Sequence, residues 1–239
     1  MTKQGTQTPP ETVVVKRFIK YNFFKVARDW RFLGPDEKAT AKKEFLKVLK
    51  RQVSVVELQY FSLVGYRRDV DFMVMAGSPD VQRFQDLFSE LVSTSLGRYL
   101  ETPYSYLAMT RRSTYLGSHT HPGQEGAGHQ AESGSKYLFV YPFVKKREWY
   151  SIPFRERQRM MADHFKIGHK YPKIKINTGY SFGLDDQEFV LAFEGDDPSE
   201  FLALVEELRS SDVSRYTQLE VPVFTCSRVS EARMLDLIA

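Results

Sequence analysis

The sequence has a single cysteine, Cys226, among its 239 residues. One thiol cannot form an internal disulfide, and no Cys or His spacing matches a zinc site. No uncharged run reaches the roughly 18 residues of a membrane span, and the opening MTKQGTQTPP lacks the apolar stretch of a secretory signal. We therefore expect a protein of a reducing compartment, the cytoplasm, without membrane insertion.

The chain also lacks a block of like charge. Its 34 Lys and Arg and 30 Asp and Glu are mixed along the sequence and leave a net charge of +4. Such mixing is a weak signal for nucleic-acid binding, so we expect none, and an anionic small ligand fits the charge equally well. The 18 Phe and 13 Tyr are many for this length and indicate an aromatic lining.

An internal duplication organises the sequence. The segment FKVARDW (24–30) reappears as FVKKREW (143–149), and DFMV (71–74) has its counterpart in EFVL (188–191). Two such echoes in the same order predict two related halves. We assign 1–12 to a disordered N-terminus, 13–115 to the first half, 116–136 to a Gly-, Ser- and His-rich connecting loop, and 137–239 to the second half.

Each half shows the same order of hydrophobic patterns, strand–helix–strand–strand–helix–strand. The class is α+β, with two ferredoxin-like βαββαβ repeats pairing their sheets into a barrel within one chain. The expected strands are 13–24, 53–64, 72–76 and 104–109, then 137–143, 174–182, 189–193 and 219–224. The expected helices begin near Pro35 and Pro153 and span 80–92 and 198–209.

The helix after Pro153 carries a histidine on its apolar face. Residues three and four apart share a helix face, so His164 lies in one stripe with Met160, Met161 and Ile167, while His169 falls at the exposed helix end. His164 is either a core histidine satisfied by one hydrogen bond or a ligand to a metal ion or a haem.

The duplication favours a functional His164, because the matching first-half helix has Glu44 or Phe45 near this place. A residue outside the shared framework is harder to explain by packing alone. No second ligand stands at a zinc-binding spacing, whereas a haem iron needs only one protein ligand.

The second half resembles a known family over 137–226. The segments KYLFVYPFVKKREWY, MMADHFKIGH and NTGYSFGLDDQEF are similar to the chlorite-dismutase-like haem superfamily and, within it, to the coproheme decarboxylases. The resemblance implies a haem-dependent oxidoreductase. Hydrogen peroxide would drive oxidative decarboxylation of the 2- and 4-propionates of iron coproporphyrin III, which is both substrate and cofactor, to the vinyl groups of haem b. It also implies a homopentamer and a coproporphyrin ferrochelatase as partner.

Four residues match functional positions of that family. The resemblance implies that His164 ligates the iron, that Tyr141 is oxidised to a radical, that Lys145 lies near the propionates and that Trp149 lines the pocket. Tyr141 and Lys145 share one face of an alternating strand. Without a ligand, Tyr141 would be a core aromatic, Lys145 a solvated surface charge and Trp149 a core anchor.

Ile176 separates activities within the family. Chlorite-dismutating members carry an arginine there and some decarboxylases a glutamine, so an aliphatic residue resembles the actinobacterial type of decarboxylase. That type uses a distal histidine from the connecting loop, which best matches His119, with His121 or His129 as alternatives to it. All three would otherwise be flexible loop histidines.

Three arginines are candidate helpers in binding the carboxylates of the substrate: Arg215, Arg111 and Arg112. Other functions also stay open on the sequence alone. The alternatives to a decarboxylase are a chlorite dismutase or general haem peroxidase, a non-catalytic haem-binding protein of the same fold, and a barrel without a cofactor.

Overall fold

The computed structural model describes residues 17–111, 113–115 and 134–238. The first half contains β1 (Phe18–Val26), η1 (Arg28–Phe32), α1 (Pro35–Gln52), β2 (Glu57–Ser62), β3 (Phe72–Ser78), α2 (Gln82–Val92), η2 (Gly97–Tyr99) and β4 (Leu100–Thr110). The second contains β5 (Tyr137–Lys145), α3 (Arg147–Ser151), α4 (Phe154–Gly168), β6 (Lys175–Tyr180), β7 (Phe189–Gly195), α5 (Pro198–Arg209), η3 (Asp212–Tyr216), β8 (Thr217–Leu219), β9 (Phe224–Val229) and α6 (Glu231–Leu237).

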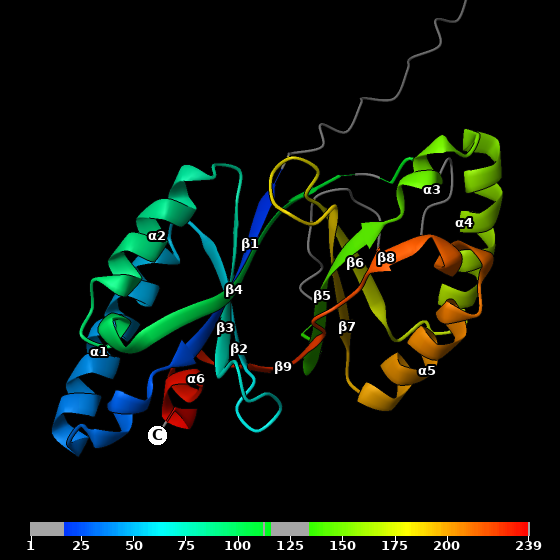
Figure 1. Cartoon of the computed structure of the whole chain (residues 1–239). Helices are drawn as coiled ribbons and strands as arrows, with labels where there is room; N and C mark the ends of the chain where they lie inside the picture. Colours follow the sequence, from blue (N-terminus) through cyan, green and yellow to red (C-terminus); the bar gives the residue numbers. More distant parts are fainter. Residues whose placement is uncertain (1–16, 112, 116–133, 239) are drawn as a thin grey trace, which may run out of the picture.

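The strands form a closed antiparallel barrel. Strand order is β4-β1-β3-β2 in the first half and β6-β7-β5-β9 in the second, which is the ferredoxin-like order twice. The β2–β9 and β4–β6 pairings join the two sheets at both edges. Helices α1, α2 and α6 cover the outside of one sheet, and α3, α4 and α5 cover the other (Figure 1). The predicted fold class is confirmed.

The two halves repeat the same hydrogen bonds. At the end of β1, the backbone N–H of Val26 donates to the Asp71 carboxylate at 2.8 Å, and at the end of β5 that of Lys145 donates to the Glu188 carboxylate at 2.8 Å. Since both pairs belong to the segments that echo each other in the sequence, the duplication is structural, and positions in one half have counterparts in the other.

Side chains of β5 alternate between two environments. Leu138 and Val140 point into the barrel, where they pack with Cys226, whereas Phe139 and Tyr141 lie in the cluster under the helices. This alternation follows from the pleat of a strand. It places the predicted functional face of β5 outside the barrel, towards α4 and α5.

Two features near the C-terminus differ from the expectation. The single strand predicted over 219–224 is wrong, because β8 ends at Leu219 and β9 begins at Phe224. Pro222 lies between them and has no N–H to donate to a sheet. Helix α6 was not predicted, and its Met234 and Leu235 are buried in the core of the first half.

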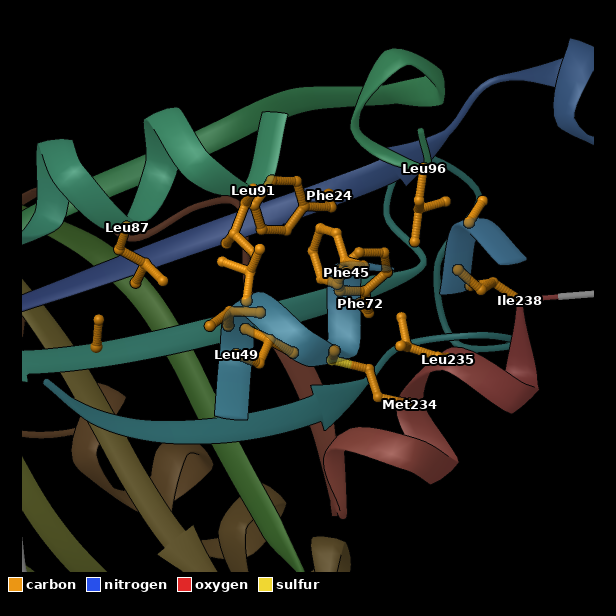
Figure 2. Packing of buried hydrophobic residues seen from close by; sticks show 14 of the residues in the cluster. Phe24, Phe45, Leu49, Phe72, Leu87, Leu91, Leu96, Met234, Leu235 and Ile238 are labelled. Atoms are coloured by element: carbon orange, nitrogen blue, oxygen red, sulfur yellow. The ribbon is translucent and has the colours of Figure 1, made fainter. Parts of the chain in front are cut away.

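The space between helix and sheet in the first half is filled by apolar side chains. Phe24 stacks on Phe72 with ring centroids 5.0 Å apart, and Phe45 of α1 meets Phe72 edge-on at 6.3 Å. Figure 2 shows these rings together with Leu49 and residues of α6. The described helices of the chain include none long and apolar enough to cross a bilayer.

Replacing Phe45 by Ala should therefore destabilise the fold. Phe45 is fully buried, so its truncation is expected to lower the free energy of unfolding by about 3–5 kcal/mol in chemical denaturation. Phe32 is 74% exposed, and Phe32→Ala is the matched control, expected to change it by about 0.5 kcal/mol or less. Equal losses for both variants would contradict this packing.

Candidate ligand site under helix α4

Helix α4 differs sharply from its counterpart in how it meets the sheet. Among the described residues, α4 buries only Met160 over its 15 residues. The counterpart α1 buries a set of five over 18 residues: Ala41, Phe45, Val48, Leu49 and Gln52. A helix normally buries a continuous apolar stripe against a sheet. The inner face of α4 is thus not completed by its own side chains.

His164 lies on this inner face with an unused nitrogen. Its Nδ1 is buried and has no hydrogen-bond partner among the described residues. Burial, together with the smaller effect of the positive charge of Lys145, lowers the pKa of the imidazole to about 4. The imidazole is therefore neutral at physiological pH. The interpretation of His164 as a core histidine satisfied by one hydrogen bond therefore does not agree with the described residues.

The rest of the predicted stripe is also in place. Met160 is buried, Met161 and Ile167 are partly buried, and the exposed His169 ends the helix as its C-terminal cap. The sequence periodicity therefore distinguished the inward histidine from the outward one correctly.

Lys145 is a buried cation without a carboxylate partner. Only 8% of its surface is exposed, its Nζ donates a 3.3 Å hydrogen bond to the carbonyl of Val213, and no ion pair involves it within the described residues. Nζ also lies 4.9 Å from the centre of the Trp149 ring. Burial lowers its pKa to about 8, although Glu188 and Glu220 act in the opposite direction. The reading as a solvated surface charge is excluded.

The carboxylate of Glu188, which raises the pKa of Lys145, already accepts other hydrogen bonds. Glu188 accepts the backbone N–H of Lys145 and, at 2.6 Å, the hydroxyl of Tyr150. In the first half, the equivalent Asp71 instead forms an ion pair with Lys25 at 2.9 Å. Lys145 thus stands one position further along its strand than Lys25 does in the first half. It lies on the helix-facing side and forms no ion pair within the described chain.

Tyr141 lies on the same face of β5 as Lys145. It is 6% exposed and stacks parallel to Phe193 with ring centroids 5.9 Å apart. Burial raises its pKa above the usual range, so the phenol stays protonated. No described residue forms a hydrogen bond with its hydroxyl. A core aromatic and a redox residue both fit this position, and the radical role remains a prediction.

Trp149 and Ile176 complete the surroundings of α4. Trp149 is 2% exposed and packs with Met160 and Val213. Ile176 on β6 approaches α4 so closely that a Cβ on Gly168 would lie 3.6 Å from its Cδ1. Gly168 is one turn after His164, so Ile176 faces the same stripe of the helix.

Of the remaining candidates, only Arg111 and Arg215 lie within the described residues, and neither is part of this cluster. His119, His121, His129 and Arg112 lie outside the described residues. The Arg215 side chain is 80% exposed and lies 3.8 Å from Asp212.

Arg111 likewise lies at the edge of the described chain, where its guanidinium is 5.7 Å from the centre of the Tyr180 ring. The structure therefore assigns no carboxylate-binding role to Arg111 or Arg215.

Arg157 is a further residue of the cluster and was not predicted from the sequence. Arg157 lies seven residues before His164 on the same face of α4, and its Nη1 donates to the Tyr115 hydroxyl at 3.1 Å. Its Nε is buried without a partner among the described residues. The spacing of two helical turns was the available signal.

The chain matches the chlorite dismutase family model over residues 38–229. A coproheme decarboxylase of Mycolicibacterium smegmatis is 32% identical over 222 residues, which cover 92% of this chain and 93% of the relative. The chain therefore belongs to the chlorite dismutase family.

Solved structures agree on the fold. Chlorite dismutase from Candidatus Nitrospira defluvii, solved in complex with imidazole, superposes with a TM-score of 0.84 at 20% identity, covering 94% of this chain and 95% of that one. A putative chlorite dismutase gives 0.81 at 17% identity, covering 94% and 99%.

Family membership confirms the expectation of a haem-dependent enzyme. The residues present fit a haem group. No cluster of three or more His, Cys, Asp or Glu side chains suited to a metal ion occurs in the described chain. A haem iron requires a single axial ligand from the protein, and the unpartnered His164 can supply it.

The buried neutral state of His164 should be visible in the pH dependence of stability. Its folded pKa of about 4 lies below the 6.5 of an exposed histidine, so the unfolded chain binds more protons between these values. In the ligand-free protein, the free energy of unfolding should fall as the pH drops from 6.5 to 4. The contribution of His164 is at most roughly 1.4 kcal/mol per pH unit.

His164→Ala should remove this part of the slope, which denaturant titrations of both proteins across that pH range would measure. Parallel stability profiles for the two proteins would show that His164 is not buried in its neutral form.

Proposed function

We propose that this chain is a coproheme decarboxylase, which uses hydrogen peroxide to convert two propionates of iron coproporphyrin III into the vinyl groups of haem b. The observation that supports this most is the inner face of α4. There His164, whose Nδ1 has no partner among the described residues, lies near the place of Phe45 in the matching helix α1, and the buried Lys145 on β5 has no ion pair within the described chain. The similarity to a coproheme decarboxylase over 92% of the chain agrees with it.

His164 would hold the iron. Its imidazole is neutral over the physiological range, and it lies on a helix rather than on a mobile loop. The porphyrin, once bound, supplies the redox chemistry of its iron. His164 would hold the iron from α4, and Trp149, Ile176 and the aromatic face of β5 would line the site.

Tyr141 would act as the oxidised residue next to a propionate. The phenol is protonated and buried, so its one-electron oxidation must be accompanied by loss of the hydroxyl proton. Its stacking on Phe193 holds the ring in one orientation. Once oxidised, a tyrosine fixed in this way could take a hydrogen atom from the propionate carbon that lies next to it.

Lys145 would bind a propionate of the substrate. An ammonium group that belongs to a residue only 8% exposed, and that has no acidic partner within the described chain, is costly unless an anion accompanies it. A carboxylate arriving with the substrate would supply that charge and hold Lys145 in its protonated form. Because Lys145 follows Tyr141 by four residues on one face of β5, it would position that carboxylate relative to the phenol.

The distal group would come from the connecting loop. His119 is the first candidate to take the proton of the peroxide, with His121 and His129 as alternatives. The predicted homopentameric assembly and supply of substrate by a ferrochelatase follow from the family resemblance, and the predicted cytoplasmic location follows from the single cysteine.

Tyr141→Phe should abolish decarboxylation while leaving substrate binding intact. The variant keeps the stacked ring but lacks the hydroxyl hydrogen that a radical mechanism requires. Porphyrin masses would be recorded after peroxide addition to the coproheme-loaded protein. Tyr137→Phe is the matched control, because Tyr137 lies on the same face of β5 and is partly buried against the same cluster. Conversion to haem b by Tyr141→Phe at the wild-type rate would refute the role.

His164→Ala should remove the axial ligand of the bound porphyrin iron. We expect a changed Soret band and at least tenfold weaker binding of coproheme in absorbance titrations. His169→Ala, five residues further along and exposed, should bind as the wild type does. Identical spectra for His164→Ala and the wild type would mean that another residue ligates the iron. Oxygen release from chlorite would instead indicate a chlorite dismutase.

A further inference from the structure

Two cationic side chains approach one aromatic group from different elements. Lys145 on β5 lies against the ring of Trp149, and Tyr115 meets the same tryptophan with ring centroids 6.2 Å apart. Arg157 on α4 donates to the hydroxyl of that tyrosine. Lys145, Trp149, Tyr115 and Arg157 thus form one continuous row, which we call the cationic row.

The guanidinium of Arg157 is held but not neutralised. Tyr115 stacks on Phe154 with centroids 5.7 Å apart and nearly parallel rings, which fixes the hydroxyl that accepts from Nη1. Nε remains buried without an acceptor, and no ion pair to Arg157 occurs within the described residues. Buried guanidinium N–H groups are normally hydrogen-bonded, so the described residues leave this N–H without the acceptor that burial normally requires.

The other arginines of α4 behave differently. Arg155 is exposed, and Arg159 is a partner of Asp163 at 3.9 Å across one turn of the helix. Arg157 alone of the three lies on the stripe that contains Met160, Met161 and His164. Its orientation towards the inner face is therefore a property of this position and not of an arginine-rich helix in general.

We propose that Arg157 is a second carboxylate-binding residue of the site, which anchors a propionate different from the one at Lys145. The inference rests on the proposed function, because it takes a polycarboxylated porphyrin as the ligand. A planar guanidinium can bind a carboxylate through two parallel N–H groups, and its free Nε provides one of them. Tyr115 acts as the positioning residue that orients the fork.

Two cations on different elements suit a ligand with several carboxylates at its rim. Lys145 extends from the sheet and Arg157 from the helix, so one flat ligand between α4 and β5 would meet them at separate points of its edge. Together with the iron bond of His164, this gives three points of attachment. Three points fix the rotation of the porphyrin about the iron axis, and hence which propionate lies at Tyr141.

Binding of metal-free coproporphyrin III tests Arg157 without any contribution from iron ligation. The full chain would be titrated with this porphyrin while the fluorescence of its two tryptophans is followed. Arg157→Gln should weaken binding about tenfold or more, because the charge-assisted hydrogen bonds of the guanidinium to a carboxylate are lost. Tyr115→Phe, which leaves Arg157 unoriented, should weaken it about threefold.

Two controls separate anchoring from general charge and folding effects. Arg155→Gln makes the same charge change on the exposed side of α4 and should bind as the wild type does. The tetramethyl ester of coproporphyrin III lacks the carboxylates, so its affinity should be equal for the wild type and Arg157→Gln. Thermal unfolding of each variant would show that the fold is retained.

The outcomes also separate this inference from the proposed function. If wild-type protein binds coproheme through His164 but Arg157→Gln matches Arg155→Gln in affinity for coproporphyrin III, Arg157 is not an anchor and the proposed function stands. If Arg157→Gln loses affinity equally for the acid and the ester, its role is structural and the inference fails. If the wild type binds neither coproheme nor coproporphyrin III, both fail.

Discussion

A helix that lies on a sheet must bury its inner face, and the two halves of this chain meet that constraint in different ways. In the first half, α1 fills the contact with Phe45, Leu49 and their neighbours. In the second, α4 contributes one buried methionine and presents His164 instead. Both halves repeat the hydrogen bond from the end of the first strand to a carboxylate, so the two helices differ in the side chains that they bury. A bound planar ligand would complete the contact that the chain leaves unfinished.

Electrostatics in the second half point the same way. Buried Lys145 and partly buried Arg157 lack acidic partners among the described residues, and the neighbouring Glu188 is engaged by a backbone N–H and by Tyr150. Unpaired cations lower the stability of a protein on its own. They are stabilised when an anionic ligand binds, so the residues that cost folding free energy in the empty protein are those that favour a polycarboxylate.

The sequence predicted the elements better than the contacts between them. The duplicated βαββαβ order, the shared face of Tyr141 and Lys145, and the inward side of His164 follow from periodicity, which each segment carries locally. Periodicity could not reveal the break at Pro222 within an apolar run or the docking of α6 on the other half. Arg157 was missed because its partner Tyr115 is 42 residues away, across the connecting loop.

The central claim is that the second half binds the porphyrin where the first half has a solid core. Hydrogen–deuterium exchange of the whole chain with and without coproheme tests this within one experiment, because each half serves as the control for the other. Slower exchange is expected in α4 and β5, with no change in α1 and β1. Protection of α1, or exchange in α4 that is unaffected by coproheme, would contradict the account.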